Sequence, residues 1–262
     1  MDLDLTGKHA LVCGGSVGIG RAAAIELALL GADVTVLARH EAALREVADA
    51  LPRPGDAQRH GWLVADGNDI AALRQQVAAL AAQRPLQILV NNSGGPPGGR
   101  AIDADASQYL AAFQQHLLAN QSLAQCVVPG MQAAGWGRII NVVSTSVKEP
   151  IANLGVSNSI RGAVASWAKT LSRELGGDGI TVNNVLPGYT LTRRLQQILD
   201  DRVASSGDSA DQVSARMLAS VPAGRFADAR EVAAAIAFLA SPAAAYINGV
   251  SLAVDGGRMQ SI

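Results

Sequence analysis

The sequence predicts an α/β fold: one doubly wound, parallel β-sheet of about seven strands, with helices on both faces. Two observations predict it. Short apolar runs alternate with Ala-rich helical stretches along the whole chain, which is the strand–helix–strand rhythm of a parallel sheet. The chain also has 262 residues, of which 49% are hydrophobic, so one large core can be buried. We therefore expect residues 1–262 to form a single domain.

Seven apolar runs are expected to form the strands. They are His9–Cys13, Asp33–Ala38, Trp62–Ala65, Leu86–Val90, Arg138–Val143, Ile180–Leu186 and Val250–Val254. The stretches expected to form helices between them are Ile19–Leu30, Glu41–Leu51, Ile70–Gln83, Ser107–Ala134 and Asn158–Leu175. Gly31 is placed to end the first helix, and Ser107 is the expected N-cap of the long one. Asp200–Asp211 is polar and rich in small residues, which predicts a mobile surface segment.

Composition excludes several classes of function. The net charge is −1 and the basic residues are scattered, so we expect no nucleic-acid partner and no membrane partner. No apolar run reaches the roughly 18 residues of a membrane span. Cys13 and Cys126 belong to no metal-type cysteine pair, and no metal site is expected. The polar, acidic stretch Met1–Lys8 resembles no signal peptide, which favours a cytoplasmic protein.

A glycine-rich turn joins the first expected strand to the first expected helix. It reads Gly14-Gly15-Ser16-Val17-Gly18-Ile19-Gly20, with the spacing G-x-x-x-G-x-G. Glycines allow a tight turn and a close approach of the backbone, and the helix N-terminus presents free N–H groups to a pyrophosphate. The turn therefore predicts a dinucleotide site. Its candidate residues are Gly14, Ser16, Gly18, Ile19 and Gly20.

This turn resembles the T-G-x-x-x-G-I-G signature of the short-chain dehydrogenases/reductases, with Cys13 in place of the threonine. Other stretches match the family in order and spacing. They are Asn91-Asn92-Ser93-Gly94, Ser144, Pro187-Gly188 with Thr190 and Thr192, Asn248-Gly249 and Asp255-Gly256-Gly257. The resemblance covers almost the whole chain and is closest to β-ketoacyl carrier-protein reductases. It implies a single-domain Rossmann-type fold and a nicotinamide cofactor.

Arg39 bears on which nucleotide is bound. The residue after the second strand reads the adenosine ribose, and an acid there would hold the 2′-hydroxyl and repel a 2′-phosphate. Arg39 instead offers a guanidinium group, which favours NADP(H) and leaves NAD(H) as the alternative. The resemblance implies further cofactor contacts from Asp66, beside the adenine, and from residues near the nicotinamide half. These are Asn91, Ser93, Gly94, Arg161, Pro187, Gly188, Thr190 and Thr192.

The catalytic positions implied by the resemblance are largely changed. The family uses a tyrosine and a lysine in Y-x-x-x-K, a serine on a neighbouring strand and an asparagine in the long helix. Ser144 matches the serine, whereas Ser157 stands at the tyrosine position and Arg161 at the lysine position. His116 falls at the asparagine position, with Asn120 as a less favoured register. A serine hydroxyl lacks the acidity of a phenol (pKa about 10), and arginine stays protonated.

Three side chains are candidates to replace the missing acid. His116 titrates near neutrality if unperturbed, Lys148 follows Ser144 in the loop over the site, and Tyr189 carries a phenol after Pro187-Gly188. Each has a structural alternative: a helix histidine bonded to the backbone, a solvated loop charge, and a packing residue of the lid. That lid is expected over residues 190–219.

The expected function is an atypical NADP(H)-dependent oxidoreductase acting on a small carbonyl or hydroxyl compound. Two alternatives stay open: a nucleotide-binding protein without turnover, and a non-redox acid–base enzyme in the same pocket. A homo-oligomer, in particular a tetramer, is also expected. In the family the two long helices pair across a two-fold axis, and here Ser107–Ala134 and Asn158–Leu175 are rich in small residues.

Overall fold

The computed structural model describes residues 1–261 and contains a seven-stranded sheet in the order β3-β2-β1-β4-β5-β6-β7. The strands are β1 (His9–Cys13), β2 (Asp33–Ala38), β3 (Gly61–Val64), β4 (Ile88–Asn91), β5 (Gly137–Val142), β6 (Ile180–Pro187) and β7 (Ser251–Val254). All neighbouring strands run parallel. The strand order reverses between β1 and β4, as in other doubly wound sheets. The predicted fold class is therefore confirmed.

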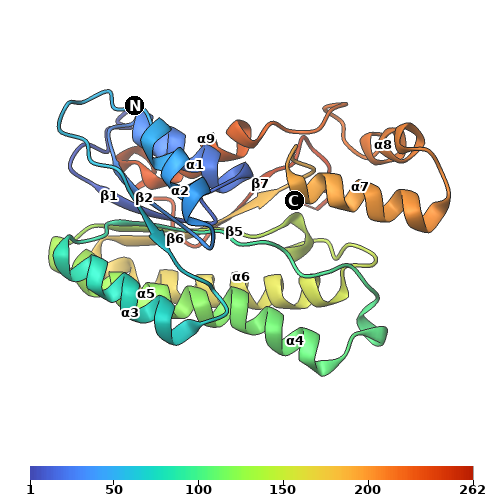
Figure 1. Ribbon diagram of the computed structural model, residues 1–262, viewed down its shortest axis with the longest axis horizontal. Coiled ribbons are helices and arrows are strands. Elements are labelled where there is room, and N and C mark those ends of the chain that lie inside the picture. The colour runs from blue at the N-terminus through green and yellow to red at the C-terminus, as the bar shows by residue number, and fades with distance from the viewer. Residues whose placement is uncertain (262) are drawn as a thin grey trace.

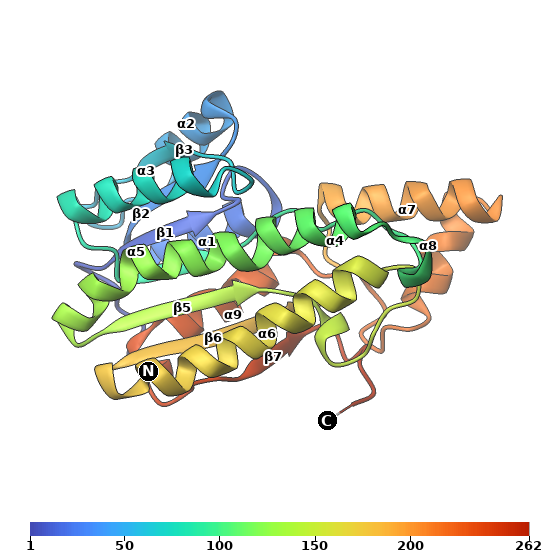
Figure 2. The same ribbon diagram turned by 90° about the horizontal axis from the view of Figure 1, so that it is seen from below.

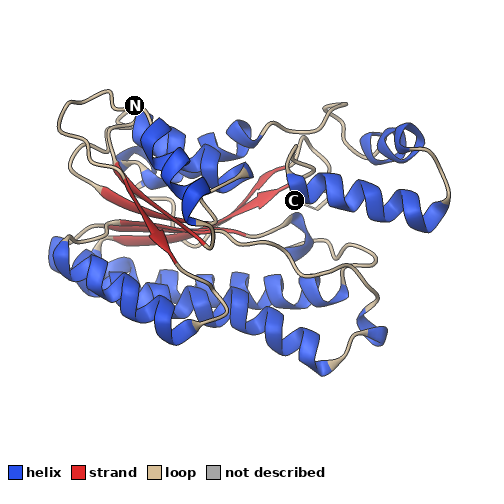
Figure 3. Ribbon diagram, viewed as in Figure 1, coloured by secondary structure: helices blue, strands red, loops and turns tan. Residues whose placement is uncertain are grey.

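Two layers of helices enclose the sheet (Figures 1 and 3). The helices are α1 (Gly18–Leu29), α2 (Glu41–Ala50), α3 (Ile70–Gln83), α4 (Ala106–Phe113), α5 (Ala119–Ala134), α6 (Gly155–Leu175), α7 (Arg193–Ser206), α8 (Ala210–Leu218) and α9 (Ala229–Ala240). Helices α1, α2 and α9 cover one face, and α3, α5 and α6 cover the other. Figure 2 shows α3 and α5 running side by side, and α7 with α8 projecting at one end of the molecule.

The core consists of two apolar layers because each central strand is buried on both faces. In β1, Ala10 and Val12 pack toward α1 and α9, whereas Leu11 and Cys13 pack toward α3 and α5. Burying one such Leu or Val side chain contributes about 1.5–3 kcal/mol. Burial also raises the pKa of the Cys13 thiol to about 12, so this cysteine is a core residue without reactive-thiol character.

The long helix predicted for Ser107–Ala134 is divided. Helix α4 begins at Ala106, and a π-helical segment, Gln114–Leu118, separates it from α5. The predicted N-cap at Ser107 is wrong. Asp105 is the N-cap, because its backbone is extended and its N–H donates to the Gln108 side chain at 2.9 Å in a capping box. Single π-turns inside helices are frequent at functional sites.

Two further expectations need correction. Helix α6 begins at Gly155, three residues before Asn158. The segment Asp200–Asp211, expected to be a mobile surface segment, is instead mostly helical, since α7 continues to Ser206 and α8 begins at Ala210. Its polar residues are used for helix ends: Gly207 closes α7 with φ of 73°, and the Ser209 side chain accepts a bond from the Gln212 N–H at 3.3 Å. Among residues 1–261, no helix is long and apolar enough to cross a membrane.

Candidate functional site

The glycine-rich turn lies at the point where the strand order reverses. Asn92 follows β4, and its Nδ2 donates to the carbonyl oxygens of Cys13 (3.2 Å) and Gly14 (3.4 Å) after β1. A Cβ at Gly14 would lie 2.6 Å from Asn92 Nδ2, and one at Gly20 would lie 2.2 Å from the Gly14 oxygen. Only glycine fits either position, so the sequence dictates a tight cradle at the carboxyl end of the sheet.

Helix α1 starts at this turn with an open N-terminus. Its N-cap, Val17, provides no side-chain hydrogen bond, so the first backbone N–H groups point outward without a cap. Ser16, Gly18 and Ile19 are half-buried around them. Thr192, the N-cap of α7, lies over the turn: a Cβ at Gly18 would be 3.1 Å from Thr192 Cγ2. The arrangement suits an anionic group held between α1 and the start of α7.

Arg39 is exposed directly after β2, and the described residues give it no ion-pair partner. The nearest acid in sequence, Glu41, is engaged by Arg45 at 2.7 Å. Asp66 is exposed after β3, and its carboxylate accepts a bond from the Asn68 N–H at 3.0 Å. Both residues stand at the same sheet edge as the glycine-rich turn, because each follows a parallel strand.

A row of amides crosses the sheet next to this edge. Asn91 donates to Asn141 (2.8 Å), Asn141 donates to Asn184 (3.0 Å), and Asn184 donates to Ser251 Oγ (3.2 Å). The parallel register aligns these four residues on β4, β5, β6 and β7. The Oδ1 atom of Asn91 is buried and has no partner within residues 1–261. Only Asn91 of this row was identified from the sequence. The signal that could have identified the others is the presence of polar residues inside three otherwise apolar strands.

His116 lies in the π-helical segment and is buried. Its Nδ1 is 2.8 Å from Ser93 Oγ, in the loop after β4. Burial, together with the nearby positive charge of Arg161, lowers the His116 pKa to about 3. The ring is therefore neutral near pH 7. Its Nε2 is buried and finds no hydrogen-bond partner in the described chain.

Ser144 and Lys148 flank the 3₁₀ turn η3 (Thr145–Val147) after β5. Ser144 is half-buried, and its Oγ accepts a hydrogen bond from the Ser146 N–H at 3.1 Å. Lys148 ends the turn, is exposed, and is held through its backbone N–H to the Thr145 carbonyl at 3.1 Å.

Ser157 and Arg161 lie one turn apart on α6. Ser157 is buried, and Arg161 Nη1 donates to the Val142 carbonyl at the end of β5 at 3.1 Å. Burial, and then the charge of Arg194, lower the Arg161 pKa to about 10, so the guanidinium stays protonated at neutral pH. Gly94, beside Gly95 in the facing loop, is exposed.

Tyr189 packs beside α7 and α8. Its ring meets Phe226 edge-on with centroids 6.1 Å apart, and the Arg258 guanidinium lies 4.5 Å from its centre. Arg258 also donates to Thr145 Oγ1 at 3.2 Å, which ties this packing to the turn after Ser144. Pro187 is the last residue of β6, and Gly188 follows it. A Cβ at Gly188 would lie 2.7 Å from Asp255 Cα. Thr190 is buried and forms a β-bridge with Ala227.

Comparison with known proteins agrees with this arrangement. The family model described as enoyl-(acyl carrier protein) reductase matches residues 14–258. The 3-oxoacyl-[acyl-carrier-protein] reductase FabG of Vibrio harveyi is 33% identical over 258 residues, covering 97% of this chain and 98% of that protein. This chain belongs to the short-chain dehydrogenase/reductase family. Its membership of an oxidoreductase family follows from the same matches.

Solved structures of this short-chain dehydrogenase/reductase family have the same fold. L-sorbose reductase from Gluconobacter frateurii, in complex with NADPH and L-sorbose, superposes with a TM-score of 0.92 at 29% identity over 100% of both chains. YwfH, an NADPH-dependent reductase involved in bacilysin biosynthesis, gives a TM-score of 0.91 at 28% identity, covering 97% of this chain and 99% of that chain.

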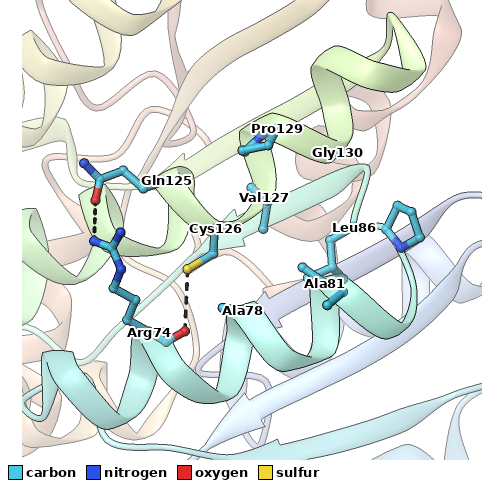
Figure 4. A pocket seen from close by; sticks show the side chains of 11 residues that line it. Arg74, Ala78, Ala81, Leu86, Gln125, Cys126, Val127, Pro129 and Gly130 are labelled. Atoms are coloured by element: carbon cyan, nitrogen blue, oxygen red, sulfur yellow. Dashed lines mark hydrogen bonds between the residues drawn. The ribbon is translucent and has the colours of Figure 1, made fainter.

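A cavity of about 300 Å³ elsewhere in this short-chain dehydrogenase/reductase lies between α3 and α5 (Figure 4). It is lined by residues of both helices and by Pro85 and Leu86, which follow α3. Its thiol, Cys126, donates to the Arg74 carbonyl at 3.6 Å, and burial raises the pKa of that thiol. The polar side chains in its wall, Arg74 and Gln125, are hydrogen-bonded to each other at 2.8 Å, and the thiol is not activated, so we assign this cavity no catalytic role.

A second cavity in this short-chain dehydrogenase/reductase, of about 450 Å³, is lined by one of the candidate catalytic residues, Tyr189. It lies among α7, α8 and the C-terminal segment. Its walls include Tyr189, Arg202, Val213, Met217 and Arg258. Arg258, one of its lining residues, also donates to Thr145 Oγ1, in the turn that follows Ser144.

Proposed function

We propose that this short-chain dehydrogenase/reductase binds NADP(H) and transfers hydride between it and a small carbonyl or hydroxyl compound. The observation that carries the proposal is the cradle of Gly14, Gly20 and Asn92 beneath the open N-terminus of α1. Glycine at both positions lets the turn pack closely against Asn92, and the uncapped N–H groups of α1 are the donors proposed to hold a pyrophosphate. The turn lies at the switch point of the sheet, where dinucleotides bind in doubly wound folds.

The residues present fit such a cofactor. Gly14, Ser16, Gly18, Ile19 and Gly20 would hold the pyrophosphate, and the free Arg39 would bind the 2′-phosphate of NADP(H). Asp66 would contact the adenine. The nicotinamide half would lie along Asn91, Ser93, Gly94, Arg161, Pro187, Gly188, Thr190 and Thr192. Both structural neighbours named above are NADPH-dependent or were solved with NADPH, which supports NADP(H) over NAD(H).

The residues that we propose to act on the reacting carbonyl group are Ser144 and Arg161. Bound NADPH supplies the hydride. Ser144 Oγ orients the carbonyl oxygen by a hydrogen bond, and the Arg161 guanidinium adds a fixed positive charge near the oxygen that gains electron density. The alcohol product also needs a proton. Ser157, at the family's tyrosine position, is a weak acid and is buried, so we assign it no proton transfer.

His116 is disfavoured as an imidazolium donor, because its pKa of about 3 leaves almost none of that form at neutral pH. We propose that neutral His116 positions Ser93 in the loop beside the nicotinamide. Lys148 and Tyr189 remain as proton donors. Lys148 is exposed and follows the Ser144 turn, whereas Tyr189 is held by Phe226 and Arg258.

The segment 190–219 is proposed to act as the lid of this single domain. It contains Thr192, α7 and α8, and with the C-terminal segment it encloses the 450 Å³ cavity. That volume falls within the ordinary range of small-molecule sites. The cavity is therefore the proposed substrate pocket.

We also propose a homotetramer. Exposed apolar side chains occur on α4 (Leu110 and Phe113) and near β7 (Tyr246 and Leu252), which are two separate surfaces. Two different two-fold contacts close a tetramer. Light scattering at micromolar concentration tests this, and a monomeric mass contradicts it.

Free Cys13 and Cys126 fit a reducing, cytoplasmic setting.

The activity test is a screen of ketones, aldehydes and alcohols with NADPH or NADP⁺, combined with calorimetric titration of both cofactors. The proposal expects NADPH binding and turnover of at least one compound class. The replaced residues at positions 157 and 161 also support a second candidate, a nucleotide-binding protein without turnover. Tight NADPH binding with no oxidation or reduction of any compound favours that candidate instead.

A further inference from the structure

Two arginines from opposite walls of the crevice meet above Gly95. Arg161 comes from α6 and Arg194 from the first turn of α7. A Cβ built on Gly95 would lie 3.5 Å from both Nε and Nη2 of Arg194, and 3.6 Å from Nη2 of Arg161. Both guanidinium groups therefore flank the same point, and a glycine leaves that point open.

Neither guanidinium group is neutralised by a carboxylate in residues 1–261. Their hydrogen bonds go to neutral oxygens only. Arg161 donates to the Val142 carbonyl, and Arg194 donates to the Pro96 carbonyl (2.7 Å) and the Gln197 side chain (3.2 Å). Two like charges in a partly buried site repel each other, and several N–H donors remain for a ligand.

We propose that Arg161 and Arg194 form a binding site for an oxyanion, either a carboxylate or a phosphate, of a molecule bound in the crevice. Guanidinium forks match the paired oxygens of both groups. The placement beside Ser144 and the lid rests on the proposed function. If the substrate supplies the oxyanion, the substrate class is narrowed to carbonyl compounds that carry an acidic group. The phosphates of the cofactor are the other source of the oxyanion.

The bond from Arg194 to Pro96 gives the site a second property. Arg194 is part of α7 in the lid, and Pro96 belongs to the loop after β4. An oxyanion between the two arginines would add a further link across the crevice. Binding of an acidic ligand is therefore expected to hold the lid against the loop.

The test uses wild-type protein, Arg194→Gln and the matched control Arg193→Gln, which removes an exposed charge from the neighbouring position on α7. Inorganic pyrophosphate is titrated into the cofactor-free protein, and malonate into the NADPH-saturated protein, by calorimetry at low ionic strength. Arg194→Gln is expected to weaken oxyanion binding by about ten-fold, and Arg193→Gln by less than about two-fold. Arg194→Lys keeps the charge and is expected to restore part of the affinity.

The two titrations separate the sources of the anion. If malonate binds the NADPH-saturated protein and Arg194→Gln weakens it, the substrate supplies the oxyanion. If only pyrophosphate binds, NADPH displaces it and Arg194→Gln weakens NADPH, then the cofactor supplies it. Both results support the site. Equal effects of Arg194→Gln and Arg193→Gln, or no oxyanion binding to folded wild type, overturn it. Binding without turnover would leave the site standing while removing the proposed reaction.

Discussion

The Oγ atom of Ser93 lies 2.8 Å from Nδ1 of His116, which joins the loop after β4 to the π-helical segment between α4 and α5. The bond orients a buried imidazole whose other nitrogen has no partner among the described residues. A buried, unpaired ring nitrogen points to a water or ligand atom at that position. The lowered pKa of His116 leaves the ring neutral near pH 7, which is why we propose for it a positioning role.

Stability should depend on pH through His116. The folded-state pKa is about 3, below the ordinary value of 6.5, so the unfolded chain binds an extra proton between these values. The free energy of unfolding should therefore fall as pH drops from about 6.5 toward 3, by up to about 1.4 kcal/mol per pH unit from this group. Buried His9, with a pKa of about 4, contributes in the same direction.

Urea unfolding across pH checks this expectation. His116→Gln should flatten the decline below pH 6.5, whereas the exposed-site control His40→Gln should leave the wild-type slope. An unchanged slope in His116→Gln means that His116 is protonated in the folded protein, contrary to the structure.

Arg39 should decide cofactor preference. The wild type is expected to bind NADPH more tightly than NADH, since no carboxylate occupies the guanidinium in the described structure. One charge-assisted contact to phosphate contributes about 1.5–3 kcal/mol, or roughly ten-fold or more in affinity. Arg39→Asp should reverse the order, while Arg45→Gln on α2 should not. Calorimetry with both cofactors measures this, and equal affinities for the wild type refute it.

The proton donor can be located by substitution. Loss of a positioned acid typically lowers the rate about 10²–10⁴-fold. We expect that loss in Lys148→Met or in Tyr189→Phe but not in both. Ser157→Ala should retain most activity. Arg161→Ala should lower both turnover and affinity for the cofactor, because Arg161 is proposed to act on the carbonyl oxygen and on the nicotinamide half. If Ser157→Ala abolishes turnover while the other variants remain active, the assignment of the catalytic roles to residues other than Ser157 is wrong.

The amide row should be important for stability. Asn141→Ala removes the middle of the row and leaves the Asn91 donor and the Asn184 acceptor buried without partners. Each unpaired buried group costs about 1–3 kcal/mol, so the variant should lose roughly 2–6 kcal/mol. The exposed control Asn68→Ala should lose less than about 1 kcal/mol. Urea denaturation measures both, and a similar loss in the two variants would mean that the row is dispensable.

Much of the fold was predictable because strand and helix periodicity are local signals. The strands at His9–Cys13 and Asp33–Ala38, and the turn at Gly14–Gly20, agree with the structure. The π-helical segment was not predictable, since its sequence, Gln114–Leu118, has ordinary helical composition. The helical residues within Asp200–Asp211 were not predicted, because polar composition alone does not distinguish a loop from helix ends with capping interactions, such as those of Ser209.

The candidate site shows the same limit. The family resemblance and its spacing assigned Ser144, Ser157 and Arg161 to the expected catalytic positions. By contrast, the row from Asn91 to Ser251 depends on strand register, and the meeting of Arg161 with Arg194 depends on how α7 crosses the loop after β4. Contacts between segments far apart in sequence require the tertiary structure.

Isotope transfer tests the central claim most directly. NADPH deuterated at C4 is incubated with the protein and a panel of neutral and acidic carbonyl compounds, and the alcohol products are analysed by mass spectrometry. The account predicts deuterium on the former carbonyl carbon of at least one product, with loss of the signal in Ser144→Ala. If the protein binds NADPH by calorimetry but no product carries deuterium, and NADP⁺ oxidises no alcohol, the chain is not a working reductase.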